Sequence, residues 1–146
     1  MKSEGKQPRA RRLRVLVADE SAASRVSLAF NLAELADVEV AGFAWTGMDA
    51  LRLIRDMRPD LAILHLGMPG LDGVEILDAL RRQRLPTPVM IMAGSPRPGD
   101  RQKCLQLGAK HFFQKTADCE LMMAVVNGYA QRRRMEGRKG GATVSC

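Results

Sequence analysis

The sequence contains few cysteines, and they are not paired in any familiar spacing. Its 146 residues include three, Cys104, Cys119 and Cys146, and no two of them form a CxxC motif. An odd number of cysteines without such a framework is unlike a secreted disulfide scaffold and favours a reducing compartment. We therefore expect a cytoplasmic protein.

Long apolar runs are lacking as well. The longest fall far short of the ~20 residues that a membrane-spanning helix needs, so no membrane span is predicted. The basic N-terminus is not followed by the apolar segment of about 7–15 residues that a secretory signal contains. Internal repeats and low-complexity segments are also missing. The length predicts one domain, and a 46% hydrophobic content allows it a sizeable core.

Most of the positive charge lies at the two ends of the chain. Six cations and one acid give residues 1–14 a charge of +5, and five cations and one acid give residues 131–146 a charge of +4, so the net +7 leaves −2 for the remainder. We expect a basic disordered tail (1–12), a folded domain (13–130) and a basic C-terminal tail (131–146). Basic tails can bind nucleic acid, but no aromatic residues alternate with these arginines to stack on bases. Nucleic acid is therefore not an expected partner.

One stretch, Leu61 to Gly73, organises the rest of the chain and reads LAILHLGMPGLDG. Its apolar beginning is typical of a strand buried on both faces, and that strand ends at His65. Glycines and a proline then break regular structure, and from Asp72 apolar residues recur at helical spacing. His65 is therefore expected at the carboxyl end of a central strand, where open α/β sheets place their ligands and chemistry.

The same alternation of strand and helix runs through the whole chain. Apolar runs predict five strands, and capping and periodicity signals predict five helices between and after them. Right-handed crossovers then require a parallel sheet covered by helices on both sides, which is an α/β fold. The predicted strands are 13–18, 38–44, 61–65, 89–93 and 110–113, and the predicted helices are 22–35, 47–57, 72–83, 100–107 and 117–133.

Two of these helices have apolar stripes that should face the core. In the first helix the stripe consists of Val26, Ala29, Phe30 and Ala33. In the last helix it consists of Leu121, Met122, Val125, Val126 and Tyr129. Arginines follow in the last turn of that helix, where a positive charge favours the helix dipole.

Four separated motifs together resemble the receiver domain of two-component response regulators. The acidic pair Asp19-Glu20 ends the first strand, and the loop His-Leu-Gly-Met-Pro-Gly-Leu-Asp-Gly follows the third. Ala93 ends the fourth strand, and Gly-Ala-Lys-His-Phe-Phe-Gln-Lys closes the fifth at Lys115. The resemblance covers about residues 13–129. It implies a flavodoxin-like (βα)5 three-layer sandwich with strand order 2-1-3-4-5.

The resemblance also implies a chemistry, the transfer of a phosphoryl group from a partner kinase's phosphohistidine to an aspartate. In the family, carboxylates hold Mg²⁺, a lysine pairs with the phosphoryl group, and a Ser/Thr hydroxyl and an aromatic residue move together as a switch. Asp19 and Glu20 match the carboxylates, Lys115 the lysine and Phe112 the switch aromatic. Met68-Pro69-Gly70 matches the family's loop.

Three positions depart from the family pattern. His65 stands at the phosphoacceptor aspartate, Ala93 at the Ser/Thr, and Thr116 at the usual proline after the lysine. An aspartyl phosphate cannot form at position 65. One of the three metal carboxylates is also lost, and imidazole is a poor ligand for Mg²⁺. We expect no cofactor, weak or no Mg²⁺ at Asp19 and Glu20, and a His65 hydrogen-bonded to that acidic pair.

We interpret the chain as a degenerate receiver that signals by protein–protein contact and is not an enzyme. Expected partners are a histidine kinase, a phosphotransfer protein or an effector, and also a second copy in a homodimer. The expected contact surface combines the 100–107 helix, the fifth strand and the last helix, because family members use it.

Several alternatives remain open at this point. The chain could be a conventional phosphorelay receiver carrying an engineered His65 substitution, or His65 itself could be phosphorylated. A metal-dependent hydrolase on the same fold would use Asp19, Glu20 and His65 as ligands. A flavin-binding protein is disfavoured, because the acidic turn after the first strand would repel a phosphate.

Overall fold

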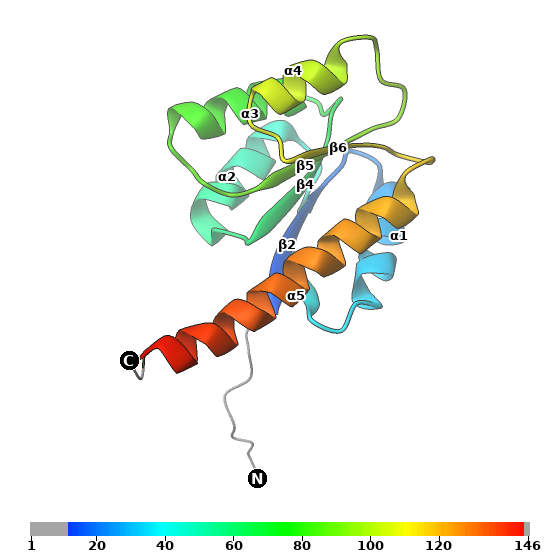
Figure 1. Cartoon of the computed structure of the whole chain (residues 1–146). Coiled ribbons are helices and arrows are strands. Elements are labelled where there is room, and N and C mark those ends of the chain that lie inside the picture. Colours follow the sequence, from blue (N-terminus) through cyan, green and yellow to red (C-terminus); the bar gives the residue numbers. More distant parts are fainter. Residues whose placement is uncertain (1–11, 145–146) are drawn as a thin grey trace.

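A five-stranded parallel sheet forms the centre of the computed structural model, which describes residues 12–144 and, of these, the side chains up to residue 136. Neighbouring strands follow the order β3-β2-β4-β5-β6, which is the predicted order 2-1-3-4-5 in chain sequence. The flavodoxin-like arrangement is therefore confirmed (Figure 1). The strands are β2 (Leu13–Ala18), β3 (Val38–Ala44), β4 (Leu61–His65), β5 (Val89–Ala93) and β6 (His111–Gln114).

Five helices cover the two faces of this sheet (Figure 1). Apolar side chains of α2, α3 and α4 pack into one buried cluster, and those of α1 and α5 into the other. The strands feed both clusters because successive side chains point to opposite faces: Leu16 belongs to the first and Val17 to the second. The helices are α1 (Ala22–Ala33), α2 (Gly47–Met57), α3 (Gly73–Arg82), α4 (Asp100–Gln106) and α5 (Cys119–Val144).

Local signals account for where several helices begin and end. Ser21 and Thr46 cap α1 and α2, each accepting a hydrogen bond from the backbone three residues on. Asp72 caps α3 in a reciprocal pair with Glu75, so the predicted start at Asp72 is the cap itself. Gly108 follows α4 by two residues and has a φ of +109°. Glycine adopts this conformation readily because it has no Cβ, and it commonly stands just after a helix end.

The apolar face predicted for α1 is wrong. The buried residues of this helix are Leu28 and Leu32, whereas Val26 and Phe30 are 68% and 71% exposed. Apolar residues lie on both sides of α1, so periodicity alone did not identify the buried one. In α5 the predicted face is mostly confirmed by the buried Met122 and Val126, but Leu121 is exposed.

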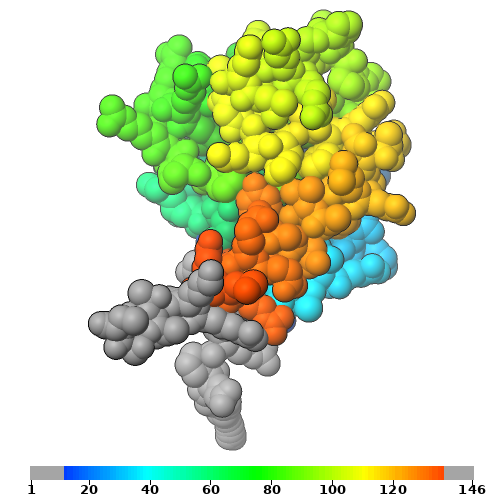
Figure 2. Space-filling view, in the orientation of Figure 1, coloured from blue at the N-terminus to red at the C-terminus, as the bar shows by residue number. Residues whose placement is uncertain are grey.

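The last helix extends further than the sequence indicated. It continues to Val144, past the predicted end at residue 133, so most of the segment 131–146 is helical. Arg133 and Arg134 pair with Asp60 and Asp37 at 3.1 and 3.3 Å, next to the starts of β4 and β3. These nonlocal pairs tie α5 to the body of the molecule, against which its orange residues lie in Figure 2. The N-terminal segment 1–11 lies outside the described residues.

Replacing Arg133 with alanine should destabilise the fold. Its side chain is 26% exposed and that of Asp60 is 16% exposed, so their attraction is only partly screened by water. We expect a loss of about 2 kcal/mol in the free energy of unfolding, between the values for surface and buried pairs. Urea titration of Arg133→Ala measures it. Arg134→Ala is the control, because its pair is more exposed; an equal loss in both would contradict the account.

Cys104 is the buried residue of α4 and packs in the core. Its side chain is fully buried, and burial, with smaller contributions from Asp100 and Asp72, raises the pKa of its thiol from 9.0 to about 11. The unfolded thiol therefore loses its proton at a lower pH than the folded one. As a consequence, this group stabilises the fold fully below pH 9, and its contribution declines as the pH rises towards 11.

The raised pKa of Cys104 predicts that the unfolding free energy depends on pH, and replacing Cys104 should remove this dependence. Between pH 9 and 11 the wild-type protein should lose about 2 kcal/mol more of its unfolding free energy than Cys104→Ala does. Denaturant titrations at several pH values measure the difference in slope. Cys119→Ala, at a half-buried position, should keep the wild-type slope. Identical slopes for wild type and Cys104→Ala would refute the prediction.

Candidate functional site

The carboxyl ends of β2 and β6 bring an acid and a lysine together. Asp19 follows β2 directly and is only 5% exposed. Its Oδ2 accepts a hydrogen bond from Lys115 Nζ at 2.8 Å, and its Oδ1 accepts one from the Ser21 backbone amide at 2.9 Å. Both carboxylate oxygens are therefore engaged, one of them by a cation.

Backbone pairing fixes the position of this lysine. The Lys115 amide donates to the Ala93 carbonyl at 2.8 Å, one step beyond the last residue of β6. The end of β5 thus places Lys115 beside Ala93, and the Lys115 side chain spans from there to Asp19. The structure thus brings Asp19, Ala93 and Lys115 together at one edge of the sheet.

Glu20, the second acid of the pair, is exposed and makes no ion pair within the described part of the chain. The surrounding turn is held by Arg25 of α1, which donates to the carbonyls of Asp19 and Glu20 at 2.8 and 3.1 Å. The same guanidinium lies 4.9 Å from the ring centre of Trp45. Sequence reasoning missed Arg25 and Trp45; the position of Arg25 one helical turn after the cap Ser21 was the available signal.

His65 ends β4 as predicted, but it does not join the acidic pair. Its Nδ1 is buried and has no hydrogen-bond partner, and neither ring nitrogen bonds to Asp19 or Glu20 in the described structure. The expected hydrogen bond is therefore wrong. His65 lines a cavity of about 670 Å³ beside α3 and α4, whereas Asp19 and Lys115 line a second cavity, between α1 and α5. Glycines at 67 and 94 flank its ring.

In the described structure these residues are not arranged as a magnesium site. Mg²⁺ prefers oxygen ligands in octahedral geometry, yet Asp19 is already bonded to Lys115 and Ser21, and position 65 offers a nitrogen. Among residues 12–136 no three His, Cys, Asp or Glu side chains are grouped closely enough to hold a metal ion. The ligand set expected for a hydrolase is thus not assembled here.

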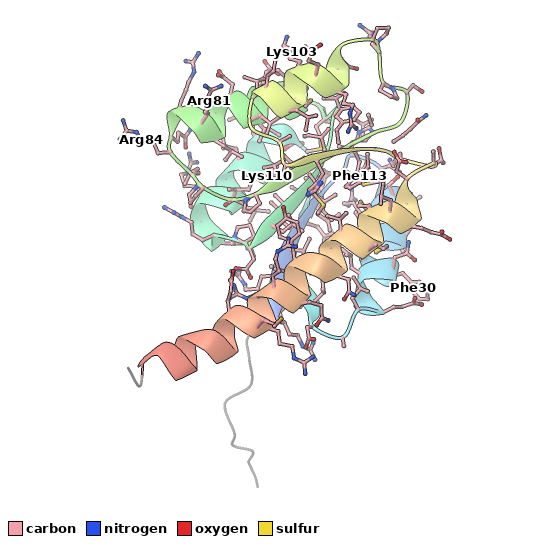
Figure 3. The ribbon with its side chains drawn as sticks, in the orientation of Figure 1. Phe30, Arg81, Arg84, Lys103, Lys110 and Phe113 are labelled. Carbon is pink, nitrogen blue, oxygen red and sulfur yellow. The ribbon has the colours of Figure 1, made fainter. Side chains whose placement is uncertain are left out.

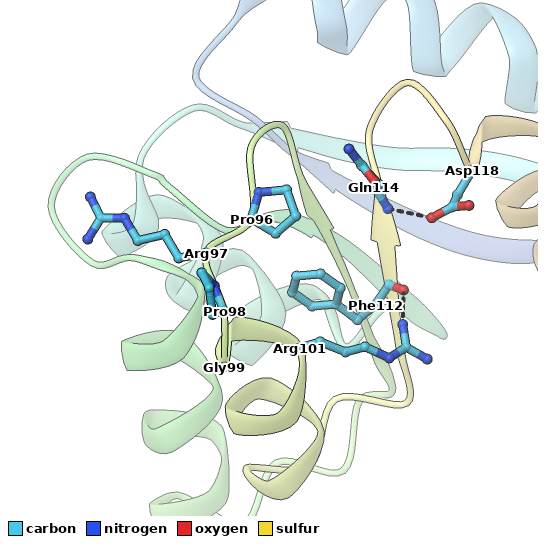
Figure 4. Close-up of a pocket in the computed structure, with 8 residues that line it drawn as sticks. All are labelled: Pro96, Arg97, Pro98, Gly99, Arg101, Phe112, Gln114 and Asp118. Atoms are coloured by element: carbon cyan, nitrogen blue, oxygen red, sulfur yellow. Dashed lines mark hydrogen bonds between the residues drawn. The ribbon is translucent and has the colours of Figure 1, made fainter.

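The switch-equivalent residues lie on neighbouring strands: Ala93 ends β5, and Phe112 is the second residue of β6. Ala93 is buried and carries no hydroxyl. Phe112 is also buried, and Figure 4 shows its ring beneath the loop that holds Pro96 and Pro98, at a cavity of about 430 Å³. Arg101 of α4 donates to the Phe112 carbonyl at 3.0 Å, which fastens α4 to β6. Sequence reasoning did not anticipate this bond.

Comparison with known proteins supports one family. The family model for the response regulator receiver domain matches residues 15–127. A curated relative, the transcriptional regulatory protein NarL of Mycobacterium tuberculosis, is 34% identical over 121 residues, which cover 82% of this chain and 56% of NarL. A protein-glutamate methylesterase/protein-glutamine glutaminase of Geobacter sulfurreducens is 36% identical over 105 residues, 72% of this chain and 28% of that protein.

Solved structures agree with the sequence relatives. The receiver domain of Mycobacterium tuberculosis NarL matches with a TM-score of 0.75 and 33% identity, over 82% of this chain and 97% of that one. The response regulator domain of Thermotoga maritima CheB matches with a TM-score of 0.68 and 28% identity.

The chain spans about half the length of NarL and less of the methylesterase. No helix in the described residues is long and apolar enough to cross a bilayer. The chain belongs to the response regulator receiver domain family.

Proposed function

We propose that this receiver works without phosphorylation at the usual position and signals by protein–protein contact. The observation that carries the proposal is His65 at the end of β4, the position of the family's phosphoacceptor, facing the loops that follow β4 and β5. An acyl phosphate forms only on a carboxylate oxygen. The imidazole offers none, so the reaction that defines the family has no acceptor at this position.

Two other positions of the family's site support the same conclusion. Lys115, the residue that would pair with a phosphoryl group, is bonded to the buried Asp19. Ala93 has no hydroxyl to transmit the presence of a phosphate to Phe112. We therefore propose that Mg²⁺ binding is weak and that the pair Asp19–Lys115 serves the fold and not phosphoryl chemistry.

In this proposal the conformation is set by a partner. A binding partner shifts the population of conformers by its difference in affinity for them, with no covalent change. The contact surface that we propose combines α4, β6 and α5, with Arg101 joining the first two elements. The partner would be a histidine kinase, a phosphotransfer protein or an effector, and the chain would act as a cytoplasmic binding module with no reaction of its own.

Incubation with a small phosphodonor such as acetyl phosphate, together with Mg²⁺, tests the proposal. Intact-mass measurement should show no phosphoryl addition to the wild-type chain. Peptide mapping decides the site if any addition occurs. Stable incorporation at His65 would overturn the proposal and would favour a phosphohistidine.

A rival explanation shares the fold but not the mechanism. A conventional phosphorelay receiver in which His65 is an engineered substitution would have the same structure. Reading the natural gene at codon 65 separates the two, because a histidine codon supports our proposal and an aspartate codon supports the rival. The metal-dependent hydrolase has no specific observation in its favour.

A further inference from the structure

An apolar patch covers the outer side of α1 and the end of the edge strand β3. It consists of Val26, Phe30, Phe43 and Trp45, which are 68%, 71%, 41% and 54% exposed, and we call it the α1 patch. Phe30 lies at the outer side of α1, away from the sheet (Figure 3). The buried contacts of α1 come from Leu28 and Leu32, so the fold does not use these four side chains to cover its core.

The α1 patch has the size of the largest apolar patch on a typical monomer. Each aromatic side chain offers roughly 200 Å², and with about half of that exposed in each of the three, plus Val26, the patch presents roughly 400 Å² of apolar surface. Patches of about this size on a single chain often mark an interaction site. A standard interface covers about 800 Å² on each partner, with an apolar centre and a polar rim. The α1 patch has the area of such a centre.

The patch combines a projecting side chain with a hollow. A depression of about 440 Å³ is lined by the small residues Ala22 and Ala29, by Arg25, and by Val26, Phe30 and Phe43 of the patch. Phe30 is the most exposed large apolar residue in the described structure. A bulky ring and an apolar hollow therefore sit side by side on the same surface.

We infer that a second copy of this chain docks on the α1 patch about a two-fold axis, with Phe30 of each copy seated in the hollow of the other. A two-fold interface uses the same patch on both copies, so the patch must be complementary to itself. A ring beside a hollow meets that requirement. The two elements that carry the patch bear charges of both signs: Arg25 lines the hollow, and the exposed Glu34 and Glu39 stand at the C-cap of α1 and in β3.

A second copy bound at the α1 patch would also contact the residue that holds the turn of Asp19 and Glu20. Arg25 lines the hollow and holds the carbonyls of Asp19 and Glu20. Docking would bury its guanidinium and the neighbouring Trp45 ring, which it already contacts. This surface lies on α1 and β3, apart from the α4–β6–α5 surface of the proposed function, and the inference does not depend on that function.

Sedimentation velocity over a range of concentrations tests the inference on the full chain. The wild-type protein should form a dimer with a dissociation constant of about 10 µM. Phe30→Glu and Val26→Glu should each weaken the dimer at least about tenfold. Fluorescence of Trp45, the only tryptophan, should shift to shorter wavelength as the wild-type concentration rises, and should not shift in Phe30→Glu.

Met48→Glu is the matched control, because Met48 is 62% exposed on α2, outside both the α1 patch and the α4–β6–α5 surface; it should keep the dimer. Circular dichroism confirms that each variant is folded, as expected for exposed positions. A wild-type protein that stays monomeric up to about 1 mM would overturn the inference, and the patch would then be free for a different protein. A dimer that survives Phe30→Glu, or is lost only in Met48→Glu, would overturn it as well.

Discussion

Replacing Gly47 with alanine should cost the protein about 3 kcal/mol of its unfolding free energy. Gly47 is the first residue of α2, and its amide donates to the Pro69 carbonyl at 2.9 Å. A Cβ at this position would lie 1.9 Å from the Leu71 carbonyl oxygen, which is backbone and cannot turn aside. The loop that follows His65 would have to move away from α2. Chemical denaturation of Gly47→Ala measures the loss.

Gly67→Ala is the control for this prediction. The nearest atom to a Cβ at Gly67 is His65 Cε1 at 3.9 Å, an ordinary contact, and Gly67 has no positive φ. We expect a loss of less than about 1 kcal/mol there. Equal unfolding free energies for Gly47→Ala and the wild type would show that the backbone of Leu71 does not pack closely against Gly47.

His65→Asp should give the protein the acceptor that it lacks. A carboxylate at position 65 would join Asp19 and Glu20 at the carboxyl end of the sheet and would supply the third oxygen-bearing side chain for Mg²⁺. Because a carboxylate next to a dication is worth several kcal/mol even at an effective dielectric constant of about 20, the affinity for Mg²⁺ should rise at least about tenfold. Acetyl phosphate with Mg²⁺ should then add one phosphoryl group, detected by intact mass.

The matched control is His65→Asn, which has nearly the shape of aspartate but no anionic oxygen. It should bind Mg²⁺ no better than the wild type and should accept no phosphoryl group. Ala93 remains in His65→Asp, so the amide signals around Phe112 should change little on phosphorylation. Failure of His65→Asp to bind Mg²⁺ would mean that Asp19 and Lys115 do not release each other, and that the site has lost more than one residue.

The sequence predicted the features that depend on local chemistry. Strands such as Leu61–His65 are short apolar runs, and helix starts such as Asp72 follow from side chains that cap the next few amides. The meeting of Asp19, Ala93 and Lys115 was predictable because parallel strands end at one edge of the sheet. The order of strands came from the family resemblance.

The features that the sequence did not reveal depend on contacts between distant segments. Arg133 and Arg134 of α5 meet Asp60 and Asp37, contacts that no local pattern shows. The buried side of α1 is the side on which Leu28 and Leu32 pack into the cluster formed with the strands and α5. His65 was expected to bond to the acidic pair because β4 and β2 end at the same edge of the sheet, yet side-chain direction at a strand end is not fixed by order along the chain.

The most direct test of the central claim uses the wild-type chain with Mg²⁺ and beryllium trifluoride, which takes the place of a phosphoryl group on a carboxylate oxygen. The measurement is the amide NMR spectrum before and after addition, read at Lys115, Phe112 and the loop after His65. Without a carboxylate at position 65 these signals should stay where they are. Saturable shifts at those residues, reached at a stoichiometric amount of the fluoride, would show that the site still accepts a phosphoryl group and would contradict the account.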